Sequence, residues 1–159
     1  YKREIIMDKY LEYQEHLEKV KENGYYLAYV PEELRTKEMC EVAVNYGGFM
    51  LQFVPEELKS PELCLIAVTQ EGYAIAFVPE DLKSPELCLI AVKDYPFALM
   101  YIPEKIKTQE LCKIAVKECL KWIVKYELEN LFEKSIPSEF QEGLAEKYDI
   151  PFPAKGQSR

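Results

Sequence analysis

The chain has 159 residues, of which 48% are apolar, and its 28 acidic and 20 basic residues give a formal net charge of −8 at pH 7. This length fits one domain with a core of its own. The negative charge argues against direct nucleic-acid binding, which requires clustered Lys and Arg. No apolar run approaches the roughly 18 residues of a membrane span, so we expect a soluble protein with no membrane contact. Five cysteines, four of them at one repeat position, favour reduced thiols and a cytoplasmic protein.

The N-terminal segment predicts an amphipathic helix. Between residues 4 and 22, apolar side chains recur three and four positions apart, at Ile6, Tyr10, Tyr13, Leu17 and Val20. We expect the helix to end at residues 23–24, with the glycine in the left-handed conformation that often follows a helix. Residues 1–23 are therefore interpreted as an N-terminal cap.

Residues 24–125 repeat with a period of 24 residues, most clearly where residues 54–68 and 78–92 differ at one position. A period of this length indicates a repeat array whose units bury their apolar faces by stacking on one another. The same offset links prolines, cysteines and Ala-Val pairs; the cysteines are Cys40, Cys64, Cys88 and Cys112. We predict an all-α, short-helix repeat solenoid of about four units plus capping helices.

Each unit follows one plan. A breaker precedes a short apolar segment, and the breakers are Gly24, Gly48, Gly72 and Pro96. A Pro-Glu-Glu-Leu turn follows, with proline expected in the first helical turn. Ser60-Pro61-Glu62 then begins a second helix, because serine caps, proline suits the first position and glutamate suits the positive helix end. We expect Leu63, Ile66 and Ala67 to face inward.

The C-terminal part departs from the repeat, as a terminal capping unit does. We expect cap helices within residues 126–150, at 127–134 and 138–148, and a flexible tail over residues 151–159. Residues 1–150 then form a single domain.

One unit carries a resemblance to a known family, through G-Y-A-I-A-F-V-P-E-D-L-K-S at residues 72–84 and L-I-A-V at 89–92. Matching copies start at Gly24, Gly48 and Pro96. These units resemble the repeats named domain of unknown function four-one-one-six, found in bacterial and phage-encoded proteins. They are also similar to leucine-rich-variant repeats, which alternate α and 3₁₀ helices. The resemblance implies a helical repeat with an interaction role and supplies no catalytic residue.

The reactive residue types favour structural roles. Units that stack roughly 10 Å apart hold the column cysteines too far apart for disulfides, so we interpret these cysteines as small buried hydrophobes. His16, the single histidine, falls in the same register, where we expect a packed position. Carboxylates recur in every unit, as do Arg35, Lys59, Lys83 and Lys107, and we expect a solvated salt-bridge face. We predict no enzyme, no metal site and no cofactor.

The positions at which units differ indicate a binding site. The residue after the column cysteine is Glu41, Leu65, Leu89 or Lys113. If this position faces solvent, the two leucines form an exposed apolar patch, and such patches mark contact sites. If the next helix covers the position, they are core residues, and the sequence leaves both alternatives open. The predicted partner-binding residues are Leu65, Leu89, Tyr73, Tyr95, Met100, Glu62 and Glu86.

Three hypotheses follow for function. The preferred one is a non-enzymatic protein-protein interaction module that binds a partner protein through a repeat face. The alternative is an acidic inhibitor, in one version phage-encoded, that blocks the basic nucleic-acid-binding groove of a host defence protein through salt-sensitive contacts. The third is a homo-oligomer whose repeats stack end to end.

Overall fold

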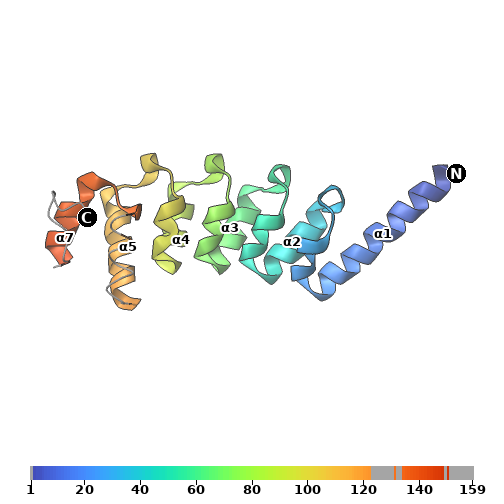
Figure 1. Cartoon of the computed structure of the whole chain (residues 1–159), viewed down its shortest axis with the longest axis horizontal. Helices are drawn as coiled ribbons and strands as arrows, with labels where there is room; N and C mark the ends of the chain where they lie inside the picture. The colour runs from blue at the N-terminus through green and yellow to red at the C-terminus, as the bar shows by residue number, and fades with distance from the viewer. Residues whose placement is uncertain (1, 123–130, 132–133, 149, 151–159) are drawn as a thin grey trace, which may run out of the picture.

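The computed structural model describes residues 2–122, 131, 134–148 and 150, and within these ranges every regular element is helical. The α-helices are α1 (Lys2–Glu22), α2 (Lys37–Tyr46), α3 (Pro61–Gln70), α4 (Pro85–Asp94), α5 (Gln109–Trp122) and α7 (Ser138–Tyr148). They follow one another along an elongated molecule with α1 and α7 at opposite ends (Figure 1). The predicted all-α repeat solenoid is confirmed.

Each unit holds two 3₁₀ helices before its α-helix, where the sequence predicted one short helix. The longer ones are η1 (Gly24–Tyr29), η3 (Gly48–Phe53), η5 (Gly72–Phe77) and η7 (Pro96–Tyr101). The three-residue ones are η2 (Glu32–Leu34), η4 (Glu56–Leu58), η6 (Glu80–Leu82) and η8 (Glu104–Ile106). The prolines before these short turns act as N-caps and lie outside the first helical turn where we expected them.

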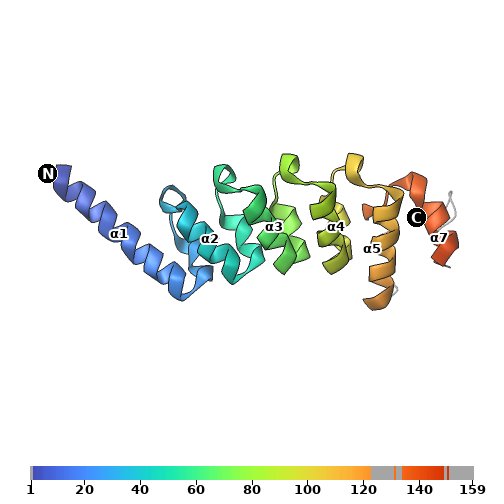
Figure 2. The same ribbon diagram turned by 180° about the vertical axis from the view of Figure 1, so that it is seen from behind.

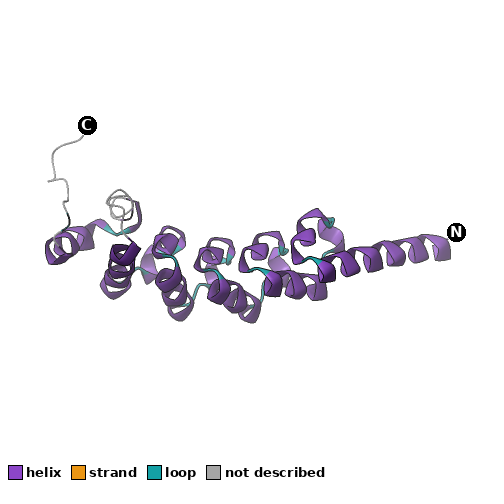
Figure 3. Cartoon of the chain, turned by 90° about the horizontal axis from the view of Figure 1, so that it is seen from below, coloured by secondary structure: helices purple, strands orange, loops and turns teal. Residues whose placement is uncertain are grey.

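The elements form two layers, which we call the α layer (α2–α5) and the 3₁₀ layer (η1, η3, η5 and η7). Each long 3₁₀ helix packs against the α-helix before it and the α-helix after it, so neighbouring units interlock. Figure 3 shows the offset between the layers from below. The short 3₁₀ turns line one long edge, the upper edge in Figures 1 and 2.

The core lies between the two layers and uses the same positions in every unit. In α3 these are Leu63, Cys64, Ala67 and Val68, and the column cysteines are fully buried. Ile66, which we expected to face inward, is 37% exposed, so that prediction was wrong. These four core positions are one, three or four residues apart, so they fill one side of the helix. Ile66 lies outside that inward stripe.

Serine caps fix where the α-helices begin. The Ser60 hydroxyl accepts a hydrogen bond from Leu63 N–H at 3.2 Å, and the Ser84 hydroxyl accepts one from Leu87 N–H at 3.1 Å. Pro61 and Pro85 occupy the first helical turn, where no N–H partner is lost. These features confirm the predicted helix start.

The glycine breakers serve close packing rather than left-handed backbone. A Cβ on Gly72 would lie 2.5 Å from the carbonyl oxygen of Ala91 in the α-helix of the same unit, and a Cβ on Gly24 would overlap the Tyr46 side chain. The chain turn at Asn23 is instead made by its own side chain, which accepts a hydrogen bond from Tyr25 N–H at 3.1 Å. The expectation of a left-handed glycine at residue 24 was therefore wrong.

The basic column is largely buried and three of its members link neighbouring units as staples, so the prediction that it lies on a solvated face was wrong, although Lys59 and Lys107 form ion pairs with Glu56 and Glu104. Lys83 is 9% exposed, and its ammonium donates to the Tyr101 carbonyl oxygen at 2.6 Å. Lys59 donates likewise to Phe77 at 2.9 Å, and Arg35 to Phe53 at 2.8 Å. Each acceptor is the last residue of the next unit's long 3₁₀ helix, whose end carbonyls need such donors.

The capping elements agree with the sequence where the structure describes them. Helix α1 supplies the expected N-terminal cap, since Leu17 and Val20 are buried while Met7, Tyr10 and Leu11 further out stay exposed. Helix α7 confirms the helix expected at residues 138–148. Most of the helix expected at 127–134, and the tail at 151–159, lie outside the described residues.

Candidate interaction face

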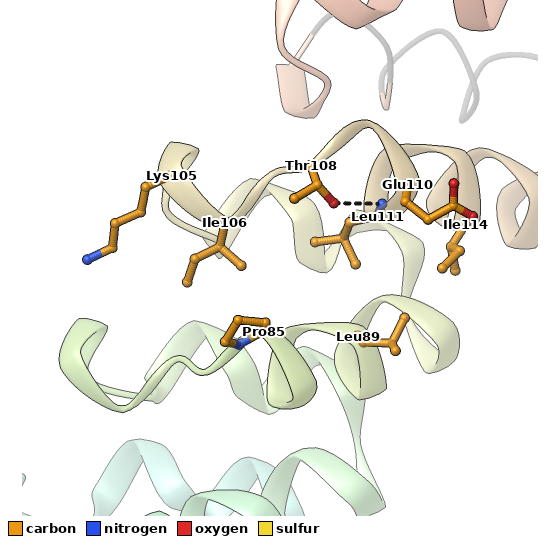
Figure 4. A pocket seen from close by; sticks show the side chains of 8 residues that line it. All are labelled: Pro85, Leu89, Lys105, Ile106, Thr108, Glu110, Leu111 and Ile114. Carbon is orange, nitrogen blue, oxygen red and sulfur yellow. Dashed lines mark hydrogen bonds between the residues drawn. The ribbon is translucent and has the colours of Figure 1, made fainter.

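A mainly apolar groove lies between α4 and α5 on the α layer. It encloses about 260 Å³ and is formed by α4, α5 and the short turn η8. Its lining residues are Pro85, Leu89, Lys105, Ile106, Thr108, Glu110, Leu111 and Ile114. In Figure 4, Pro85 and Leu89 form one wall, the α5 side chains form the other, and Lys105 lies at one end.

The same groove occurs two units earlier between α2 and α3, but there it is polar. Six of its lining positions correspond at two 24-residue periods, including Lys37 in place of Pro85 and Glu41 in place of Leu89. Lys37 and Glu41 form an ion pair at 3.7 Å, and the Asn45 amide donates to the Glu41 carbonyl at 2.7 Å. The polar groups of the α2–α3 groove thus contact one another, whereas the α4–α5 groove offers apolar surface.

The predicted leucines both lie on the α layer but differ in exposure. Leu65 is 46% exposed, and Leu89 is half-buried as part of the groove wall beside α5. The sequence left open whether this position faces solvent or is covered by the next helix. The first alternative describes Leu65, and the second describes Leu89. Ile66, next to Leu65, adds apolar surface that the sequence assigned to the core.

The predicted glutamates, Glu62 and Glu86, stand exposed in the first turns of α3 and α4. Hydrogen bonds from its own backbone N–H and from the Ser60 hydroxyl lower the pKa of the Glu62 carboxyl. This residue therefore keeps its charge at neutral pH. Both carboxylates lie on the α layer with the leucines, as predicted.

The predicted aromatic residues lie in the other layer. Tyr73 is on η5, Met100 is on η7, and Tyr95 joins α4 to η7. The Tyr73 ring lies 5.8 Å from Tyr95 and 5.7 Å from Tyr101, centroid to centroid. Burial and a hydrogen bond with Tyr73 raise the pKa of the Tyr101 phenol. Tyr73, Tyr95 and Tyr101 form a cluster of their own instead of the rim predicted around the leucines.

The long edge formed by the short 3₁₀ turns is acidic. Seven exposed carboxylates recur there, namely Glu32, Glu33, Glu56, Glu57, Glu80, Asp81 and Glu104. One position departs from this pattern: the column that reads Glu33, Glu57 and Asp81 ends in Lys105 at the α4–α5 groove.

The cysteines and the histidine, which are residue types that can support catalysis, occupy buried or partly buried positions. The four column cysteines are free and buried, and burial raises the pKa of each thiol to about 11, which keeps it protonated and weakly nucleophilic. His16 is partly buried with its ring centroid 5.9 Å from that of Tyr26. Within the described residues, no three His, Cys, Asp or Glu side chains gather as metal ligands would.

The sequence did not predict the groove itself. Pro85, Ile106 and Ile114 come from three elements of two adjacent units, so no contiguous pattern reports them. The sequence does contain one indication of the groove: at equivalent positions of the repeat, Lys37 and Glu41 are replaced by Pro85 and Leu89. That comparison found Leu89 but needed the structure to supply its neighbours.

The fold and the groove define a helical-repeat protein with an apolar groove on its α layer. Residues 17–59 and 36–83 match the family model described as "Domain of unknown function (DUF4116)", and so confirm the resemblance over that part of the chain. No curated protein and no solved structure gives a significant match. Among the described helices, none combines the length and apolar character needed to cross a bilayer.

Proposed function

We propose that this protein is a non-enzymatic binding module that recognises a partner protein through the exposed side of its α layer, with the α4–α5 groove as anchor site. The supporting observation is the replacement of Lys37 and Glu41 by Pro85 and Leu89 at corresponding positions of the two grooves. Both groove versions are compatible with the fold, so stacking alone does not require the apolar one. Apolar surface of this kind on a protein marks a contact site.

The size of the groove favours a protein partner over a free small molecule. Its volume of about 260 Å³ is below the roughly 300–1,000 Å³ typical of ligand clefts. A groove of this size suits a large apolar side chain from a partner surface, and such anchors in pockets carry much of the energy of protein interfaces. Leu65 and Ile66 extend the apolar surface onto α3. The reduced, buried cysteines support a cytoplasmic setting.

Site-specific photo-crosslinking in host cells tests this proposal. p-Benzoylphenylalanine replaces Glu110, which is exposed at the groove, or, as the control, Gln52, which is exposed on the 3₁₀ layer. We expect one partner protein to crosslink at position 110 and not at position 52. Leu89→Glu places in the groove the residue type that Glu41 has in the α2–α3 groove, so folding is retained, and the crosslink is lost. Equal crosslinking at both positions, or a crosslink that survives Leu89→Glu, contradicts the proposal.

The acidic edge supports a second candidate, an inhibitor that blocks the basic groove of a nucleic-acid-binding protein. Its carboxylates project at a regular interval along one side of an elongated molecule, as a row of phosphates does. Binding of this kind weakens steeply with salt because exposed charges are screened. A partner that is released at high salt and is indifferent to Leu89→Glu identifies this function instead.

A further inference from the structure

Lys105 reverses the sign of the acidic edge at the one place where the edge meets the apolar groove. Its counterparts in the other three units are Glu33, Glu57 and Asp81. Lys105 is exposed, and within the described part of the chain its ammonium makes no hydrogen bond or ion pair. The neighbouring Lys107 differs, because it is buried and bonded to Glu104 at 2.7 Å.

The fold does not need a cation at this position. Three other units fold with a carboxylate there, and the structural staple of each unit is the buried basic residue two positions later. Beside the cation of the fourth unit lies the groove, where Leu89, Ile106 and Ile114 offer apolar surface. A free ammonium beside an apolar groove provides complementary charge for an acidic group next to an apolar anchor.

We propose that the α4–α5 groove binds a peptide segment of a partner protein in which a large aliphatic or aromatic side chain is accompanied, within about one helical turn, by an Asp or Glu side chain. The apolar side chain enters the groove between Pro85 and Ile106, at the end nearest Lys105, and the carboxylate pairs with Lys105 (Figure 4). This inference rests on the proposed function and specifies the chemistry of the partner. Pairing with a single exposed lysine sets specificity more than raw affinity.

A random dodecapeptide phage library selected against the full chain tests this proposal. We expect the enriched peptides to share an apolar residue with Asp or Glu close by. The best sequence is then synthesised with an acetylated N-terminus and an amidated C-terminus, so that a terminal carboxylate is not the source of the charge. Its dissociation constant is measured by fluorescence anisotropy for the wild type and for two variants of equal charge change.

The variants are Lys105→Glu, which copies the residue of the earlier units, and Lys117→Glu, which alters an exposed residue of α5 outside the groove lining. We expect Lys105→Glu to weaken binding about tenfold, and Lys117→Glu to have little effect. A peptide whose acidic residue is replaced by lysine regains its affinity for the Lys105→Glu protein.

The outcomes separate this inference from the proposed function. If the selected peptides lose binding with Leu89→Glu but respond equally to both lysine variants, the groove is an anchor site and the role of Lys105 is refuted. If binding ignores Leu89→Glu as well, or if no peptide is enriched, both proposals are refuted. Enrichment of lysine-rich peptides that ignore Leu89 assigns binding to the acidic edge and also contradicts the inference.

Discussion

The buried lysine column shows how one side chain links two units. Lys83 donates to the Tyr101 carbonyl at 2.6 Å from a buried position, and hydrogen bonds to charged groups contribute roughly 1.5–3 kcal/mol. We expect Lys83→Met, which keeps the aliphatic stem, to lower the free energy of unfolding in urea by about that amount. Lys93→Met removes an exposed lysine of α4 and should change stability by less than about 0.5 kcal/mol. If the two variants lowered stability equally, the hydrogen bond between Lys83 and the Tyr101 carbonyl would not be an important source of stability.

The column cysteines make stability fall at alkaline pH. Burial raises their thiol pKa from 9.0 to about 11, so between these values the folded chain keeps protons that the unfolded chain releases. The unfolded state therefore binds fewer protons, and the free energy of unfolding decreases as pH rises. Each thiol accounts for about 1.4 kcal/mol between pH of about 8 and about 10. Urea unfolding of Cys88→Ala at both pH values should show a smaller fall in the free energy of unfolding, by about a quarter of the thiol contribution. If the fall equals that of the wild type, the buried thiols do not cause it.

In three of the four units, glycine stands where the long 3₁₀ helix meets the α-helix of the same unit, and in the fourth unit Pro96 takes this position. A Cβ on Gly72 would press against the Ala91 carbonyl oxygen and the Asp94 side chain, whose carboxylate accepts the Gly72 N–H bond at 2.7 Å. We expect Gly72→Ala to destabilise the protein by about 1–3 kcal/mol through overpacking. Gly143 on α7 has open space around its Cβ position, so Gly143→Ala should stabilise by roughly 0.5–1 kcal/mol. Thermal unfolding followed by circular dichroism compares the two, and a stable Gly72→Ala protein would mean that the layers shift easily.

The elements differ in how well the sequence predicted them, for physical reasons. The start of α3 was predictable because Ser60 and Pro61 act locally, through one cap and one missing N–H. The role of Lys59 was not, because a basic residue repeated at each period suits a surface ion pair and a buried staple equally well. In the structure Lys59 does both, since it pairs with Glu56 and donates to the Phe77 carbonyl of the next unit, whose position the sequence does not give. The α4–α5 groove was missed for the same reason, since its walls meet only after two units stack.

Across the whole molecule, stability comes from neighbouring units, because η3 packs on α2 and α3 and η5 on α3 and α4. Because each contact joins only neighbouring units, the fold does not depend on one particular number of units, as in other quasi-one-dimensional repeat arrays. The two central units are nearly identical in sequence. Removing one complete period should therefore leave a working interface behind.

Deletion of residues 61–84 tests this modularity together with the location of the site. It joins Ser60 to Pro85 and so restores the Ser-Pro-Glu helix start, while Lys59 gains the Tyr101 carbonyl as its acceptor. All lining residues of the α4–α5 groove remain, whereas Leu65 and Tyr73 are lost. We expect a folded protein whose urea m-value falls by roughly 15%, in proportion to the 24 of 159 residues removed, and which still binds the groove peptide. Deletion of residues 61–72 alone removes α3 and only half of a 24-residue period, so the following units no longer fit the repeat, and we expect folding to be abolished. A folded full-period deletion that no longer binds the peptide would assign the anchor site to Leu65 and α3.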